Sequence, residues 1–169
     1  MNKNFLLILL LLIVGGWYLS YLASRLDRLH HRVETSWEHL DALLQRRAAI
    51  AIEISHLPQL DAASALVLTA VAFQAREATI VDRSDAESSL TGSLALIKPE
   101  LSELASTPAI TTLHSELQEI TEKIRVGVVI HLEAVSAARN LRSKILCRFF
   151  RLAGHAPLPI TYAFEVDQI

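Results

Sequence analysis

The run of 18 residues from Phe5 to Leu22 carries no charged side chain, and no proline or glycine separates it from the amphipathic pattern that follows. As a helix rising 1.5 Å per residue it is about 27 Å long, close to the roughly 30 Å thickness of a bilayer's hydrocarbon core. We therefore expect residues 1–22 to form a transmembrane anchor that continues into a helical body. The expected span includes Phe5, Leu12, Gly16, Trp17, Tyr18 and Leu22, with the aromatic residues toward one membrane interface.

A cleaved signal peptide is the alternative for this segment. Signal peptidase sites need small residues at the first and third positions before the cut, but cuts after Ala23 or Ser24 put Tyr21 or Leu22 at the third. We therefore expect an uncleaved anchor. Its small residues Gly16, Ser20 and Ser24 recur every four positions, a spacing that lets two transmembrane helices approach closely. Such spacings also arise by chance, so a homo-oligomer through the anchor is an open alternative rather than a prediction.

The basic residues on either side of the anchor predict its orientation. Lys3 alone precedes the span, whereas Arg25, Arg28 and Arg32 follow it closely. Because Lys and Arg are enriched on the cytoplasmic side, we expect a short extracytoplasmic N-terminus and a cytoplasmic body. Cys147, the single cysteine, cannot form an intramolecular disulfide, which agrees with a reducing compartment.

The composition argues against several functional classes. A net charge of −2 with two Trp, three Tyr and five Phe in 169 residues is untypical of a nucleic-acid binder, which needs a basic surface and stacking aromatics. The chain has no glycine-rich phosphate loop and no G-x-S-x-G nucleophile elbow. We therefore expect no nucleic-acid partner, no cofactor and no enzymatic activity.

Apolar periodicity and helix-end signals divide the rest of the chain into four helices. The first continues from the anchor to a break at Pro58, since apolar residues recur at spacings of three and four from Leu22 to Ile54. The second is expected from its cap Asp61 to about Val81. Ser84 and Glu87 predict a capping box at the start of the third helix, which Pro99 should kink or split. Thr107 as cap, followed by Pro108, predicts the start of a fourth helix that ends at Gly154.

Short connections favour antiparallel neighbours, so we predict an all-α fold in which the transmembrane helix continues into an antiparallel four-helix bundle over residues 23–154, with long first and last helices and a tail at 155–169. The end of the last helix should then return to the bilayer. A basic collar there would bind anionic lipid, whereas the alternative is that its cations complement the helix dipole and stay solvated. The collar comprises Arg25, Arg28, Arg32, Arg142, Lys144, Arg148 and Arg151.

The stretch VETSWEHLDALLQRRAAI, residues 33–50, resembles the opening signature of the LemA family, in which a transmembrane helix runs into a V-E-x-A-W-x-x-I-D-x-x-L-x-R-R pattern. The closing pair Phe164-Glu165 is also similar, whereas AAIAI after the arginines and His131-Leu132 depart from the family's pattern, as in a divergent member. The resemblance implies a cytoplasmic helical body without a settled biochemical activity. The matching positions are Val33, Glu34, Trp37, Asp41, Leu44, Arg46 and Arg47.

Structural roles are favoured for the signature residues. Trp37 lies on the apolar stripe and is expected in the core, while Asp41 and Arg47 are too poorly spaced to pair on one helix and are expected to pair with other helices rather than form a ligand site. His131, on the stripe of the last helix, is either a hydrogen-bonded core residue or a proton-sensitive switch. Cys147 is expected to pack rather than react.

Helical bundles can hold metals through paired Glu-x-x-His motifs. The chain has a single one, Glu53 with His56, and an exposed trio, His31, Glu34 and Glu38, that we expect to be solvated. We therefore expect a non-enzymatic interaction or scaffold module at the membrane surface, with an unidentified protein partner. The alternative is a metal-dependent or redox enzyme with a site inside the bundle.

Overall fold

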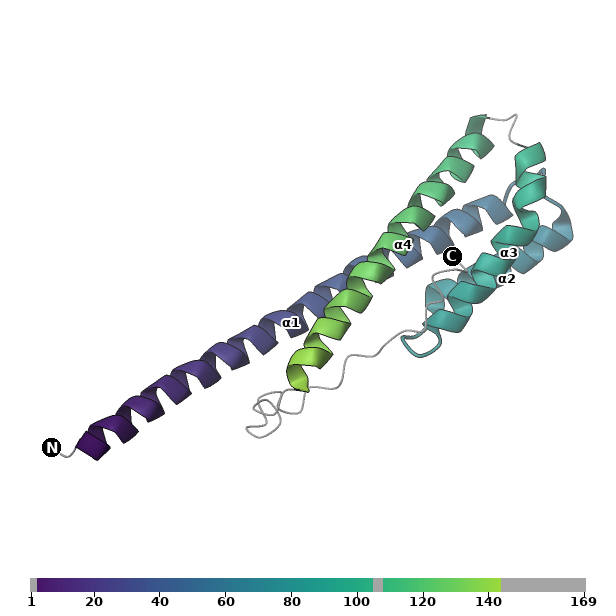
Figure 1. Cartoon of the computed structure of the whole chain (residues 1–169). Helices are drawn as coiled ribbons and strands as arrows, with labels where there is room; N and C mark the ends of the chain where they lie inside the picture. Colours follow the sequence, from purple (N-terminus) through teal and green to yellow (C-terminus); the bar gives the residue numbers. More distant parts are fainter. Residues whose placement is uncertain (1–2, 105–107, 144–169) are drawn as a thin grey trace. The chain divides into compact units, whose positions relative to one another are not determined.

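The computed structural model describes residues 3–104 and 108–143, and these residues form four helices and no strand (Figure 1). The helices are α1 (Lys3–Ser55), α2 (Ala62–Glu77), α3 (Arg83–Glu103) and α4 (Pro108–Arg142). The predicted all-α fold with long first and last helices is confirmed. The described residues divide into two compact units: an anchor unit of residues 3–36 and 132–143, and a body unit of residues 37–104 and 108–131.

In the anchor unit, α1 begins with an apolar stretch that is largely exposed among the described residues. In its most apolar stretch of 18 residues only 6% of the residues are buried. Leu11 and Leu12, for example, are 71% and 66% exposed. By length and composition this helix could cross a membrane. Beyond this stretch, Leu22 and Leu26 of α1 are buried with Leu141 of α4, and Leu29 packs against them.

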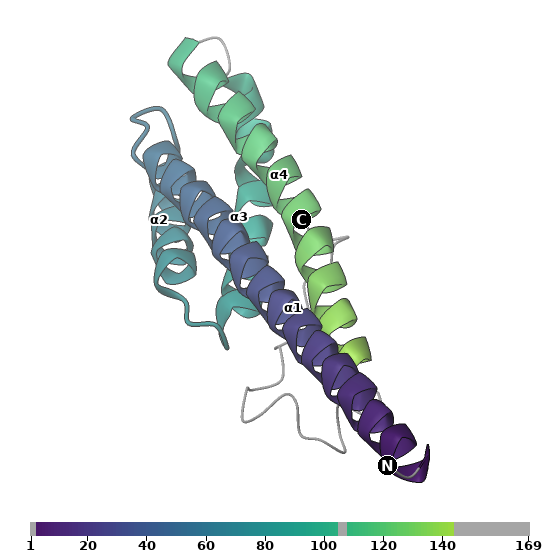
Figure 2. The same cartoon turned by 90° about the vertical axis from the view of Figure 1, so that its left-hand side faces the viewer.

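The body unit contains α2, α3 and the adjoining parts of α1 and α4, with α2 and α3 side by side in both views (Figures 1 and 2). Its core is aliphatic, because helix periodicity brings one apolar stripe of each helix inward. Small side chains contribute where helices approach closely, as at Gly127, where an added Cβ would lie 3.3 Å from Leu40 Cδ1. The core includes Leu40, Leu44, Ala48, Leu68, Ala72, Leu90, Ile97, Ile124 and Val128.

The helix ends confirm some local signals and correct others. Asp61 caps α2 as predicted, its carboxylate accepting from the backbone N–H of Ala63 and Ser64, but α2 ends at Glu77 rather than near Val81. The predicted capping box of α3 is wrong. Asp82 is the N-cap residue and makes no side-chain capping bond, while Glu87 is buried in contact with another helix.

Two further positions differ in part from the expectation. Of the two effects expected of Pro99, a kink or a split, the split does not occur, because α3 continues through Pro99 to Glu103. α1 ends at Ser55, three residues before Pro58. α4 is described from Pro108, the predicted first helical position, whereas its predicted cap Thr107, its expected end at Gly154 and the tail at 155–169 lie outside the described residues.

Candidate functional site

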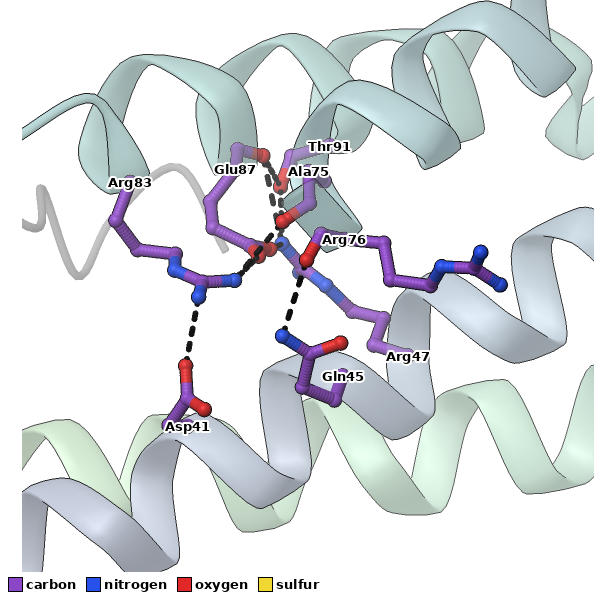
Figure 3. A network of polar contacts seen from close by, with 8 residues as sticks. All are labelled: Asp41, Gln45, Arg47, Ala75, Arg76, Arg83, Glu87 and Thr91. Atoms are coloured by element: carbon purple, nitrogen blue, oxygen red, sulfur yellow. Dashed lines mark hydrogen bonds and ion pairs between the residues drawn. The ribbon is translucent and has the colours of Figure 1, made fainter. Parts of the chain in front are cut away.

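The signature arginine Arg47 lies in a buried polar network within the body unit (Figure 3). Its Nη2 is 2.5 Å from Oε2 of Glu87 on α3 and donates a 3.2 Å hydrogen bond to Oγ1 of Thr91. Arg47 and Glu87 are only 1% and 2% exposed. The contact therefore joins α1 to α3 through a desolvated ion pair.

A second arginine, Arg83 of α3, extends this network. Its Nη2 is 2.7 Å from Oδ1 of Asp41 on α1, and its Nη1 donates a 2.8 Å hydrogen bond to the carbonyl of Ala75 on α2. The same Nη1 lies 4.0 Å from Oε1 of Glu87. Arg83 thus links three helices, and the two buried arginines enclose a single buried carboxylate.

The electrostatics of Glu87 reflect this enclosure. Burial raises the pKa of its carboxyl, while the charges of Arg47 and Arg83 act in the opposite direction. In low dielectric both the desolvation penalty and the attraction are large, so the pair is stabilising only while both partners are present. The arrangement is suited to fixing the packing of three helices.

The neighbouring arginine faces a different environment. Arg46 donates through Nε and Nη2 to Oε1 of Glu116 on α4, with an Nε to Oε1 distance of 2.9 Å, and lies 3.6 Å from Glu53. These side chains are exposed by a third or more. Asp41, Arg46 and Arg47 thus each pair with a residue of another helix, as expected for Asp41 and Arg47.

The aromatic part of the signature contacts the last helix. The rings of Trp37 and His131 have centroids 5.6 Å apart and are tilted by 56°. His131 is buried, as expected, and its burial lowers the pKa of the imidazole. Trp37 is half-buried rather than fully in the core. Leu44 is fully buried.

The remaining candidates are more exposed. Val33 is half-buried, and the exposed Glu34 lies 3.9 Å from His31. Among the described residues no group of three His, Cys, Asp or Glu side chains could hold a metal ion, and Glu53 contacts Arg46 rather than His56.

The cations of the predicted collar are described in part. Arg25, Arg28 and Arg32 are exposed on α1, where Arg32 lies 3.7 Å from Glu133 of α4, and Arg142 is half-buried. The remaining collar residues, Lys144, Arg148 and Arg151, lie outside the described residues, and so does Cys147.

Sequence reasoning missed the partners of the signature residues, namely Arg83, Glu87, Thr91 and Glu116. One signal was available, since Glu87 falls on the apolar stripe of α3 between Arg83 and Leu90, where an unpaired carboxylate would be costly. The comparisons add no identity to this geometry: no protein-family model, no curated protein and no solved structure matches the chain.

Proposed function

We propose that this chain is a single-pass membrane protein of the LemA type whose helical body serves as a non-enzymatic interaction module at the cytoplasmic membrane surface. The observation that supports the proposal is α1 itself, a continuous helix of 53 residues. Its first part is apolar and exposed, and its last part contributes buried side chains to the core of the body unit. Such a helix tethers a folded body to a bilayer without a linker. In this role the buried Arg47 and Arg83 hold the helices of the body together.

Exposed apolar side chains on α2 support the interaction role. Leu66 and Val67 are 72% and 52% exposed, and Phe73 of the same helix is 37% exposed beneath the guanidinium of Arg76. Leu66 and Phe73 are two helical turns apart and so share one face of α2, and an exposed apolar helix face is typical of a surface that binds another protein. We assign the protein partner to this surface.

Site-specific photo-crosslinking tests the interaction role. A benzophenone amino acid at Leu66 should give a discrete protein adduct in living cells, whereas the same residue at Ser88, an exposed polar position of α3, should not. The partner identified in the adduct should bind the purified chain, and Leu66→Asp should abolish this binding. Equal labelling from both positions would overturn the assignment.

Cysteine accessibility tests the orientation. Val81 lies between α2 and α3 and is 83% exposed, so Val81→Cys on a Cys147→Ser background gives one reactive thiol in the body. A membrane-impermeant maleimide should label it only after lysis, and should label the matched variant Asn4→Cys in intact cells. The reverse pattern would place the body outside the cytoplasm.

A metal analysis of the purified chain tests the alternative of a metal-dependent enzyme. We expect the purified chain to contain no stoichiometric metal and to keep its binding when Glu53 is replaced by alanine. A bound metal that is lost in Glu53→Ala would contradict the proposal of a chemically inert module.

A further inference from the structure

A cavity of about 460 Å³ lies between α3 and α4 in the body unit, and Arg47 of α1 also lines it. This volume is in the range of small-molecule sites in proteins. Its walls are largely aliphatic, formed by Leu94, Leu101 and Leu117. An apolar chain would therefore find a complementary surface there.

The polar groups of the cavity are mostly hydrogen-bond donors. Arg47 is 1% exposed, and its Nε is buried without a hydrogen-bond partner among the described residues. The Nδ1 of His114 is also buried without one, while Nε2 of His114 lies 3.1 Å from the amide nitrogen of Gln118. Since an amide nitrogen can only donate, the ring Nε2 accepts and the proton of the neutral imidazole is on Nδ1.

The charges around the cavity leave one cation without a carboxylate. Glu87 offsets Arg47, and Glu122, which lines the cavity, accepts from Arg125 Nη1 at 2.8 and 3.0 Å. Lys98 also lines the cavity and is exposed, with no ion pair in the described part of the chain. The residues that line the cavity thus include one ammonium group without a carboxylate and two side chains, Arg47 and His114, that each keep one buried nitrogen without a hydrogen-bond partner in the described part of the chain.

We propose that this cavity binds an aliphatic organic anion. Its chain packs against the leucines, and its carboxylate or phosphate group accepts from Lys98 and from the buried N–H groups of His114 and Arg47. Charge-assisted hydrogen bonds of this kind favour an anionic over a neutral head group. The inference goes beyond the interaction role and does not depend on it, since it rests on the lining of one cavity in the body unit.

Photolabelling of the full chain in nanodiscs of zwitterionic phosphatidylcholine tests the inference. The probe is dodecanoic acid carrying a diazirine in its chain, and mass spectrometry should locate the label in residues 91–125. Unlabelled dodecanoate should compete at concentrations at least tenfold lower than dodecanol does, because the alcohol has the same chain without the charge. Equal competition by the two compounds would overturn the proposal.

Three variants locate the site. Lys98→Gln, at an exposed position, should weaken dodecanoate about tenfold, the loss of roughly one charge-assisted hydrogen bond. Lys123→Gln removes an exposed cation of α4 that pairs with Glu119 and does not line the cavity, so it should leave the affinity unchanged. Ala95→Trp, also at an exposed lining position, should fill the cavity and abolish labelling. Unchanged labelling in both Lys98→Gln and Ala95→Trp would overturn the site.

Adding anionic phosphatidylglycerol to the nanodiscs distinguishes the sources of the anion. A loss of cavity labelling would identify a membrane lipid as the occupant, and undiminished labelling would identify a free single-chain anion. Both outcomes keep the chemistry proposed here, whereas labelling confined to the apolar segment of α1 would contradict it.

Discussion

Arg46 and Arg47 are adjacent in the chain and pair with carboxylates of different helices, yet their solvation differs greatly. The Arg46 contact with Glu116 is exposed, so water and salt screen it, and such pairs contribute about 0 to 1 kcal/mol. The Arg47 contact with Glu87 is buried, so removal of one partner leaves an uncompensated charge in low dielectric. Comparing variants of the two arginines therefore shows how burial changes the contribution of an arginine–carboxylate pair to the stability of the fold.

We predict that Arg47→Met lowers the free energy of unfolding of the whole chain by about 3 to 5 kcal/mol, because the buried Glu87 then loses its hydrogen-bonded partner and keeps only the longer contact with Arg83. Arg46→Met should cost about 1 kcal/mol or less. Urea denaturation in a mild detergent, followed by circular dichroism, measures both. The double variant Arg47→Met with Glu87→Leu should recover most of the loss, and a double variant as unstable as the single one would contradict this explanation.

His131 gives the body unit a pH dependence of defined sign. Burial holds the pKa of its imidazole below the ordinary value of 6.5, so unfolding takes up a proton between the two values. Its contribution to stability is complete above pH about 6.5, falls as the pH drops toward the folded-state pKa, and is level below it.

We therefore predict that the free energy of unfolding of the native chain, minus that of His131→Gln, decreases as the pH falls below about 6.5. Other titrating groups are common to both proteins and cancel in this difference. A difference that does not vary with pH for His131→Gln would show that the imidazole is not desolvated.

At the scale of a helix, the two glycines of the body unit have opposite surroundings. An added Cβ at Gly92 of α3 meets nothing within 4 Å, whereas at Gly127 of α4 it meets the side chains of Leu40 and Leu43 at 3.3 and 3.6 Å. Alanine is better than glycine in a helix by up to about 1 kcal/mol, because it restricts the unfolded chain. Only Gly92 can realise this gain without displacing the core.

We predict that Gly92→Ala raises the free energy of unfolding by about 0.5 to 1 kcal/mol and that Gly127→Ala does not raise it, since the fully buried Leu40 must move. Gly127→Leu should cost about 1 to 3 kcal/mol by overpacking. Thermal unfolding of the three variants under one condition gives the order. A gain for Gly127→Ala equal to that for Gly92→Ala would show that α4 has room to shift.

The helix ends show which local signals the sequence determines. Asp61 and Pro108 act within one turn of chain, through a carboxylate on nearby N–H groups and a proline at the first helical position, and both starts were predicted correctly. Ser84 and Glu87 have the same local spacing as a capping box, but the carboxylate of Glu87 accepts a hydrogen bond from Arg47, which lies 40 residues earlier in the chain. The charged network could therefore be predicted as interhelical, although its partners could not, because helical periodicity does not encode which helices meet.

At the scale of the whole molecule, the expected function depends on the apolar segment of α1 being in a membrane. Its exposed leucines would be unfavourable in water, and no described residue of the chain covers more than a small part of them. A charge at the centre of a transmembrane helix costs about 2.5 to 3.5 kcal/mol on insertion scales. Leu12 is 66% exposed, so an arginine there would face lipid rather than protein.

We predict that the double variant Leu9→Arg, Leu12→Arg moves a large share of the chain from the carbonate-resistant membrane fraction to the soluble or aggregated fraction. Leu66→Arg places the same charge on the exposed face of α2, outside the apolar segment, and should leave the chain in the membrane fraction. If the double variant stayed carbonate-resistant, α1 would not be the membrane anchor. If the native chain were extracted by carbonate, the apolar face of α1 would instead have to be covered by protein, and the site of interaction would move from α2 to α1.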